Sequence, residues 1–331
     1  MTKILGYGEL MLRFTPKDNL SENNNSEDFK TNFGGSESNS LCFLASKGFD
    51  CTFLSAFPNN ELGLRSKQFL HNYNVKTNIS LDNNRLGVYY TIPGKNNNLT
   101  KIAYDRDNSS FSKYKLPENL INDSLKDISH LIISGITPAL SKTCYDNIFK
   151  IIDISKYKGI KIIYDINYRE NLWSLDDCKN FNLKIFNYID FLFTNANTLS
   201  RVLGISFKKQ SGKLFSQTEN AINYINENFN IPFVSMTVRD NDFLGGVLFT
   251  DNDFYRSETY NIDHVDRVGA GDAFLAATMN GVFNNWDYHK IISYSTSAFA
   301  LSHTIFGDVN LFDDDEIENF KNNSIESAKG E

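Results

Sequence analysis

The chain has 331 residues, of which 41% are hydrophobic and 14% aromatic, and its formal net charge is -7 at pH 7. This composition is that of a globular protein, and the length suits one large α/β domain with an accessory part, or two domains. A negative net charge without a basic stripe excludes nucleic acid as a general partner, and no apolar run approaches the roughly 20 residues of a membrane span.

The first residues and the cysteines indicate the cellular compartment. The opening MTKILGYGEL has neither the basic and apolar layout nor the cleavage site of a secretory signal. The cysteines lie far apart without CxxC spacing, so we expect reduced thiols in the core rather than a disulfide framework or a zinc site. We therefore expect a soluble, cytoplasmic protein. The cysteines are Cys42, Cys51, Cys144 and Cys178.

Short apolar runs rich in β-branched residues alternate along the chain with longer segments of helical period. Predicted strands cover residues 3–8, 51–56, 130–135, 160–166, 190–195, 232–238 and 246–250. Predicted helices cover residues 37–48, 62–73, 141–159, 217–229, 271–283 and 287–303. This alternation predicts an α/β fold, a doubly wound and mainly parallel sheet flanked by helices.

Two stretches do not follow this alternation. Residues 10–18 and 85–106 have the pattern of extended strands joined by polar turns, with a hairpin tip expected between Pro93 and Asn98. They predict a small β-sheet outside the main one, which would close over a site as a lid. We place this lid at about residues 10–33 and 85–112, inserted in a single domain of residues 1–331.

The most informative stretch is DHVDRVGAGDAFLAATMNG at residues 263–281, where a glycine loop enters a predicted helix. Free N–H groups and the helix dipole at such a start favour an anion, and glycine lets the main chain approach it. We therefore expect Gly269, Ala270 and Gly271 to bind a phosphate. A Walker loop is absent, and so is the third glycine of a nicotinamide-binding GxGxxG.

Asp272 follows the glycine loop directly. A carboxylate in the first turn of a helix often does no more than complement the helix dipole. Here it would also lie within reach of a hydroxyl brought up to the bound phosphate, which is where phosphoryl transfer needs a base. We interpret Asp272 as the candidate base and keep the dipole role as the alternative.

Two motifs resemble the signatures of a known family. VDRVGAGDAF resembles the C-terminal signature of the ribokinase-type carbohydrate kinases, the PfkB family, and GGSESNSLCFLASKG at residues 34–48 resembles their N-terminal one. The resemblance extends from residue 6 to residue 312. It implies a ribokinase-like sheet with a β lid, ATP as the phosphoryl donor, magnesium as the metal and a sugar hydroxyl as the acceptor.

Further segments resemble the branch of this family that phosphorylates 2-keto-3-deoxygluconate more than they resemble ribokinases, fructokinases or adenosine kinases. They lie at residues 104–110, 134–141, 165–173, 266–274 and 303–311. Glu9 also replaces the aspartate of many neutral-sugar kinases, and an acidic substrate would need an arginine to bind its carboxylate. The substrate contacts that the resemblance implies are Gly34, Gly35, Tyr90, Tyr104, Arg106, Arg169 and Asp308.

Both arginines also have structural alternatives. Arg169 follows a predicted strand, at the sheet edge where ligands bind in open α/β folds. It could equally form a surface ion pair with Glu170 or Asp176. Arg106 lies in the predicted lid and by itself could be a solvated charge. The resemblance implies substrate binding for both.

On the nucleotide side, Asn195 matches the family's Asn-x-x-Glu element, but Thr198 stands where the acid would be. That acid helps to position magnesium, so another carboxylate would serve or the phosphates and water would hold the ion. We assign no metal ligand. Thr237 and Arg239 match positions near the ATP phosphates and ribose, and both could also be ordinary residues at the end of a strand.

The residues and the resemblance together predict a kinase that uses ATP and Mg²⁺ to phosphorylate the 6-hydroxyl of 2-keto-3-deoxygluconate. The product would be 2-keto-3-deoxy-6-phosphogluconate, with Asp272 as base and the amides of residues 269–271 as the anion hole for the ATP phosphates. Two alternatives stay open: a kinase of this family for fructose or another keto sugar acid, and a non-catalytic relative that binds a sugar acid. We expect a homo-oligomer, a dimer or higher.

Overall fold

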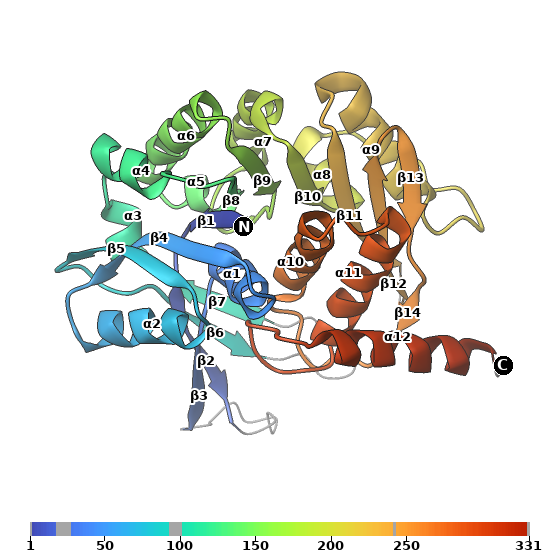
Figure 1. Ribbon diagram of the computed structural model, residues 1–331, viewed down its shortest axis with the longest axis horizontal. Helices are drawn as coiled ribbons and strands as arrows, with labels where there is room; N and C mark the ends of the chain where they lie inside the picture. The colour runs from blue at the N-terminus through green and yellow to red at the C-terminus, as the bar shows by residue number, and fades with distance from the viewer. Residues whose placement is uncertain (1, 18–27, 93–100, 241–242, 330–331) are drawn as a thin grey trace.

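The structure is a computed structural model that describes residues 2–17, 28–92, 101–240 and 243–329. The predicted hairpin tip between Pro93 and Asn98 lies outside these residues. A large sheet runs through the molecule with helices on both faces, and a separate small sheet lies beside it (Figure 1).

The main sheet has the strand order β13-β12-β11-β10-β9-β8-β1-β4-β5, and β14 pairs with β12. Its strands are β1 (Lys3–Tyr7), β4 (Asp50–Pro58), β5 (Lys76–Asp82), β8 (His130–Ser134), β9 (Lys161–Asp165), β10 (Phe191–Thr194), β11 (Phe233–Asp240), β12 (Phe243–Thr250), β13 (Asp253–Arg256) and β14 (Tyr260–Asn261). All pairs from β11 to β5 are parallel, and every pair that involves β12 is antiparallel. Only two residues separate β11 from β12, too few for the crossover that a parallel pair requires.

Two apolar layers cover the sheet, one on each face, because side chains alternate along every strand. In β10, Leu192 packs into one layer and Phe193 into the other. The second layer is completed by α1 (Ser36–Ser46), α2 (Glu61–Asn72), α10 (Ala270–Phe283), α11 (Tyr288–Ser302) and α12 (Asp314–Lys329). The first is completed by α3 (Ser110–Lys113), α4 (Glu118–Ser124), α6 (Lys142–Tyr157), α7 (Leu175–Ile185), the 3₁₀ helix η1 (Phe186–Tyr188), α8 (Ala196–Leu203) and α9 (Ser216–Phe229). The short helix α5 (Ile136–Ala139) packs against α6.

The predicted fold class, a doubly wound and mainly parallel α/β sheet, is confirmed. Several elements were not predicted, among them β5 and α7. The side chains of β5 are only half-buried or exposed, because this strand lies at the edge of the sheet, so its sequence KTNISLD lacks an apolar run. The short helices similarly contain too few residues to show a clear period.

The predicted small sheet is also present, in the order β3-β2-β6-β7. Its strands are β2 (Met11–Pro16), β3 (Phe29–Gly34), β6 (Val88–Ile92) and β7 (Lys101–Asp105). β2 pairs antiparallel with β3 and parallel with β6, and β6 pairs antiparallel with β7. The two predicted lid segments therefore meet in one sheet. Closure of that lid stays a prediction.

The strand order reverses its direction at β1, with β4 and β5 on one side and β8 to β11 on the other. In open α/β sheets, ligands bind at the carboxyl ends of the strands beside such a reversal. Four polar residues stand at these ends, Glu9 after β1, Ser134 in β8, Asp165 in β9 and Asn195 after β10. The topology thus brings together residues from four separate parts of the chain.

All four cysteines are buried free thiols, and burial raises the pKa of the Cys42 thiol to about 12. Within the described ranges, none of the helices combines the length and the apolar composition that a membrane span requires.

The central strands should contribute most of the stability. Leu192 in β10 is fully buried (0% exposed), whereas Leu183 on α7 is 41% exposed. We expect Leu192→Ala to lower the free energy of unfolding in urea by about 2 to 5 kcal/mol, because it removes buried methyl groups and leaves a cavity. Leu183→Ala should change it by less than about 0.5 kcal/mol. Equal losses for the two variants would contradict this placement of the core.

Candidate active site

A cavity of about 570 Å³ lies over the carboxyl ends of the parallel strands and is lined by residues from both sheets. Residues from each predicted group, for the sugar, for the nucleotide and for the chemistry, line it. They are Gly34, Gly35, Tyr104, Arg106, Arg169, Asn195, Thr237, Arg239, Gly269, Gly271, Asp272 and Asp308. The structure therefore brings together segments that span most of the chain.

The Asp272 carboxylate lies at the start of α10 and is hydrogen-bonded to the start of α1. Ser36 Oγ donates to Asp272 Oδ1 at 2.8 Å, and Asn39 Nδ2 donates to Oδ2 at 2.7 Å. Asn167 Nδ2 donates in turn to Ser36 Oγ at 2.9 Å. These contacts orient the carboxylate towards another helix, so it does more than complement the dipole of its own helix.

The environment of Asp272 raises the pKa of its carboxyl group far above the ordinary value. Burial raises the pKa of this carboxyl group to about 8, against the hydrogen bonds from Asn39 and Ser36, which lower it. The neighbouring Asp165 raises it further, and Arg169 lowers it. Asp165 is itself desolvated, with a pKa raised to about 6. A carboxylate with such a pKa, open to a cavity, is suited to accept a proton from a hydroxyl group.

The glycine loop presents backbone amides beside this carboxylate. Gly269 has a φ of +83°, and a Cβ there would lie 2.0 Å from the carbonyl oxygen of Asp308, so glycine is required for packing. Apart from its chain neighbours and the backbone of its own helix, a Cβ at Gly271 would meet no protein atom within 4 Å. The amides of Gly269, Gly271 and Asp272 donate to no acceptor in the described parts of the chain. The loop thus combines free donors with open space.

The expected role of Ala270 needs correction. Its N–H donates to the carbonyl oxygen of Arg267 at 3.4 Å, and its side chain is fully buried in the core. The first turn into α10 uses this amide, so Ala270 offers neither a free donor nor a side chain to the cavity. The amide of Asp272 is the third donor instead.

The glycine pair before α1 is held closely by its neighbours. A Cβ at Gly35 would lie 2.2 Å from the carbonyl oxygen of Glu9, and one at Gly34 would lie 2.6 Å from Tyr89 Oη. Gly35 N–H donates to Asn39 Oδ1 at 3.2 Å, which fixes the Asn39 amide so that its nitrogen faces Asp272. Both glycines line the cavity, and Gly35 also orients a partner of the candidate base.

The expected place of Tyr90 in the pocket is wrong. Tyr90 is 41% exposed and stacks on Phe14 at a ring distance of 5.2 Å, on the face of β6 that points away from the cavity. Its neighbour Tyr89 lines the cavity instead and donates to Asp308. Successive side chains of a strand point to opposite faces, so an error of one residue exchanges inside and outside.

Arg169 is not part of a surface ion pair. Glu170 accepts from Arg201 at 2.7 Å instead, and Arg169 Nη1 donates to the carbonyl oxygen of Tyr168 at 3.2 Å. In the part of the chain that the structure describes, no carboxylate forms a salt bridge with Arg169. Its guanidinium lines the cavity and is available to an anionic ligand.

Arg106 is buried rather than solvated, with 6% of its surface exposed. Its Nε donates to Glu9 Oε2 at 2.8 Å, its Nη2 reaches the same oxygen, and Ser109 donates to Glu9 Oε1. Glu9 and Arg106 therefore form a paired unit in the cavity wall. Nη1 of Arg106 has no hydrogen-bond partner among the described residues, which leaves one edge of the guanidinium for a ligand.

Two more arginines line the other end of the cavity. Arg239 is open to the cavity but surrounded by protein, and this desolvation, with the charges of Arg267 and Arg169, lowers its pKa to about 10. Its Nη2 lies 3.3 Å from His303 Nε2, and burial lowers the pKa of His303 to about 3. Over the described residues, neither Arg239 nor Arg267 forms a salt bridge with a carboxylate. Such a cluster of uncompensated cations favours a polyanion.

The described residues on the nucleotide side do not form a set of protein ligands for a metal ion. Asn195 Oδ1 accepts from the N–H of Thr198 at 2.8 Å and so caps α8 at the cavity wall. Among the residues that the structure describes, no three histidine, cysteine, aspartate or glutamate side chains are grouped to hold an ion. Thr237 lines the same side of the cavity from β11.

Several site residues were missed from sequence, namely Ser36, Asn39, Asp165, Asn167 and Arg267. One signal in the sequence could have indicated Ser36 and Asn39. The polar residues SESN fill the first turn of the helix after the glycine pair, where an amphipathic helix would contain both polar and apolar residues. In the structure, Asn167 has a φ of 38°, a left-handed conformation that asparagine tolerates better than most residues.

Comparison with known proteins gives consistent results. A 2-dehydro-3-deoxygalactonokinase of Haloferax volcanii is 27% identical over 96% of this chain and 95% of its own length. A 2-dehydro-3-deoxygluconokinase of Bacillus subtilis is 25% identical over 85% of this chain and 83% of its own. The crystal structure of a 2-dehydro-3-deoxygluconokinase from Thermotoga maritima superimposes with a TM-score of 0.91 at 29% identity, covering 97% of this chain and 100% of that one.

The model of the pfkB family carbohydrate kinases matches residues 1–310, which include both glycine motifs and every residue of the cavity. The chain therefore belongs to the pfkB family of carbohydrate kinases.

Proposed function

We propose that this protein is an ATP-dependent kinase of a keto-deoxy sugar acid, with 2-keto-3-deoxygluconate as acceptor and its 6-hydroxyl as nucleophile. The observation that carries the proposal is the Asp272 carboxylate beside the free amides of Gly269 and Gly271, in a cavity with uncompensated arginines. Relatives named as kinases of 2-dehydro-3-deoxy sugar acids support the acceptor class.

An acidic acceptor accounts for a cation that a neutral sugar would leave without a partner. Arg169 lines the cavity without a carboxylate partner among the described residues, and the free edge of Arg106 can add a second donor. The Glu9 carboxylate beside Arg106 can accept from a hydroxyl of the same ligand. 2-Keto-3-deoxygluconate and 2-keto-3-deoxygalactonate differ only in the configuration at one carbon, so both are candidate acceptors. We propose 2-keto-3-deoxygluconate.

In the proposed reaction, Asp272 accepts the proton of the 6-hydroxyl while that oxygen attacks the γ-phosphorus of ATP. The bond from the γ-phosphorus to the bridging oxygen breaks, and ADP leaves. The amides of Gly269, Gly271 and Asp272 would stabilise the charge on the transferred group, because donors already in place need no reorganisation. Arg239 and Arg267, with Thr237 nearby, would hold the remaining phosphates.

The residues present fit a nucleotide but do not form a cage for Mg²⁺. A magnesium ion usually keeps several waters and binds through phosphates with one or two carboxylates, so it would enter with ATP. Bound there, it would neutralise charge on the β- and γ-phosphates. We further propose that the small sheet closes over the cavity and excludes water. The expected homo-oligomer stays a prediction.

The pH dependence tests the base. Because Asp272 must be deprotonated to accept the proton, kcat/KM should rise about tenfold per pH unit below pH 8 and level off above it. Asp272→Asn, which keeps the size of the side chain, should lower kcat by about 10²- to 10⁴-fold and remove this pH dependence. A coupled ADP-release assay measures both. A variant as fast as the wild type would rule out Asp272 as the base.

A matched pair of glycine variants tests the phosphate site. Gly271→Ala adds a methyl group that would meet no protein atom within 4 Å outside its own turn of helix, so the protein should keep its thermal stability. If a phosphate occupies that space, kcat/KM for ATP should fall about 100-fold through misplacement of the transferred group. Gly269→Ala should instead lower Tm, because of the φ of +83° and the clash with Asp308. Full activity of Gly271→Ala would contradict the assignment.

An acceptor panel at fixed ATP tests the substrate. We expect turnover of 2-keto-3-deoxygluconate to exceed that of its galactonate counterpart and to exceed that of fructose by far. Arg169→Met should raise KM for the keto acid by about 10- to 100-fold, the value of a charge-assisted hydrogen bond, and leave KM for ATP nearly unchanged.

Two results would favour the alternatives. Faster turnover of fructose than of either acid would indicate a neutral-sugar kinase of the same family. Tight binding of the keto acid by calorimetry, with no ADP release from any acceptor, would indicate a non-catalytic sugar-acid-binding protein.

A further inference from the structure

Arg13 is a charged side chain in the interior of the molecule, with 1% of its surface exposed. It belongs to β2 of the small sheet, and its Nε donates to the hydroxyl oxygens of Thr15 and Thr91, both at 2.8 Å. A buried guanidinium needs partners for its donors and a countercharge. The countercharge comes from outside the small sheet.

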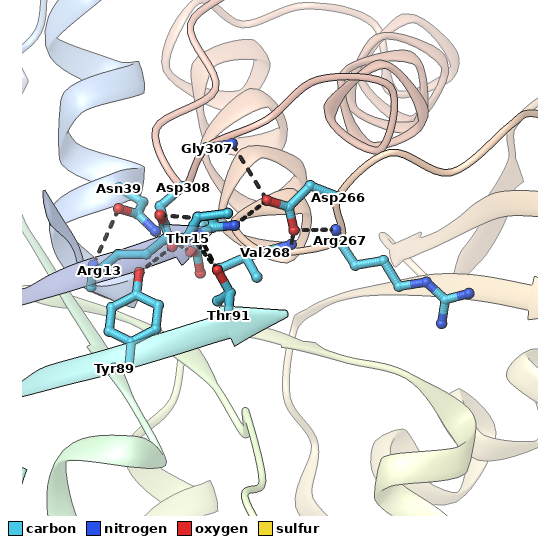
Figure 2. Close-up of polar contacts among 12 residues, drawn as sticks. Arg13, Thr15, Asn39, Tyr89, Thr91, Asp266, Arg267, Val268, Gly307 and Asp308 are labelled. Carbon is cyan, nitrogen blue, oxygen red and sulfur yellow. Dashed lines mark hydrogen bonds and ion pairs between the residues drawn. The ribbon is translucent and has the colours of Figure 1, made fainter. Parts of the chain in front are cut away.

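Two buried carboxylates supply the countercharge. Arg13 Nη1 donates to Asp308 Oδ2 at 3.0 Å, and Nη2 is bound to Asp266 Oδ2. Figure 2 shows the guanidinium between these two aspartates. Burial alone would lower the pKa of Arg13, but Asp308 and Asp266 raise it above its ordinary value, so the group is charged.

Asp266 shapes the loop that leads into the glycines. Its Oδ1 accepts from the N–H groups of Arg267 at 2.8 Å and Val268 at 3.2 Å, and its Oδ2 accepts from Gly307 N–H at 3.5 Å. Gly269 follows Val268 in the chain, and its Cα lies against the backbone of Asp308. The partners of Arg13 thus belong to the two chain segments beside the free amides, and Figure 2 shows the contacts of Asp266 with Arg267, Val268 and Gly307.

We propose that Arg13 is a positioning residue for phosphoryl transfer, which holds the loop of residues 266–269 in the conformation that presents its amides to the phosphate. It touches neither substrate and acts through Asp266 and Asp308. The assignment of the amides as the phosphate site rests on the proposed function; the restraint of the loop by Arg13 does not.

The same contacts connect this loop to the acceptor side of the cavity. Tyr89 lines the cavity from β6 and donates to Asp308 Oδ1, while Arg13 binds the other oxygen of that carboxylate. The Asp308 carboxylate is therefore bound by two residues of the small sheet, while the backbone of Asp308 packs against Gly269. A shift of β2 away from the main sheet would remove the countercharge from Asp266 and Asp308 together.

Arg13→Lys is the informative variant. Lysine keeps the positive charge, but its ammonium group cannot fork onto two carboxylates and two hydroxyls at once. We expect kcat to fall about tenfold or more, because the amides lose their orientation in the transition state, while KM for ATP and for the acceptor changes less than about threefold. The amides of Arg267 and Val268 should exchange with deuterium about tenfold faster than in the wild type.

Two controls separate positioning from a loss of stability. Thr91→Val removes one acceptor of Arg13 Nε and leaves both carboxylate contacts, so kcat should stay near the wild-type value. Leu192→Ala destabilises the main sheet, to which Arg13 does not belong, and below its Tm it should keep kcat and the exchange rates of both loop amides. An equal loss of kcat in Leu192→Ala would mean that stability alone explains the Arg13→Lys result, and would overturn the proposal.

Wild-type kcat together with wild-type exchange at Arg267 and Val268 in Arg13→Lys would also overturn it. The exchange measurement needs no substrate. If the wild-type protein phosphorylates no acceptor on the panel, the proposed function fails, and the exchange rates still decide whether Arg13 restrains the loop.

Discussion

The hydrogen bonds from Ser36 and Asn39 to Asp272 join the start of α1 to the start of α10. Ser36 precedes Asp272 by 236 residues in the sequence, and Asn39 precedes it by 233. A desolvated carboxylate is costly, and these two donors offset only part of that cost, which leaves its pKa near 8. The arrangement requires α1 and α10 to begin at the same place. The glycine pair before α1 and the glycine loop before α10 provide that close approach.

The charge of the whole chain and the charge of the cavity lead to different conclusions. A net charge of -7 argues against nucleic acid as a partner, yet three arginines of the cavity have no carboxylate partner within the described residues. The fold produces this difference, because it collects Arg169, Arg239 and Arg267 from separate segments at one edge of the sheet. Arginines without a carboxylate partner, rather than the net charge of the chain, favour an anionic ligand.

The small sheet does more than line the cavity. One face of β2 and β6 directs Arg13 and Tyr89 to Asp308, while the opposite face stacks Phe14 on Tyr90. Strand alternation makes both possible with adjacent residues. The polar face links the cavity wall at Tyr89 to the loop that leads into the glycines, and a guanidinium left without its carboxylates there would be strongly destabilising.

Local patterns in the sequence were sufficient to predict the alternating strands and helices, the separate small sheet and the glycine loop before Asp272, since each depends on neighbours within a few residues. Most of the predicted site residues line the cavity. The sequence could not determine that Tyr89 rather than Tyr90 faces inward, because register is set by pairing across strands. Nor could it pair Arg106 with Glu9, or Arg13 with Asp266 across 253 positions. Only the tertiary structure decides such partners, because burial, not sequence distance, selects which charges must meet.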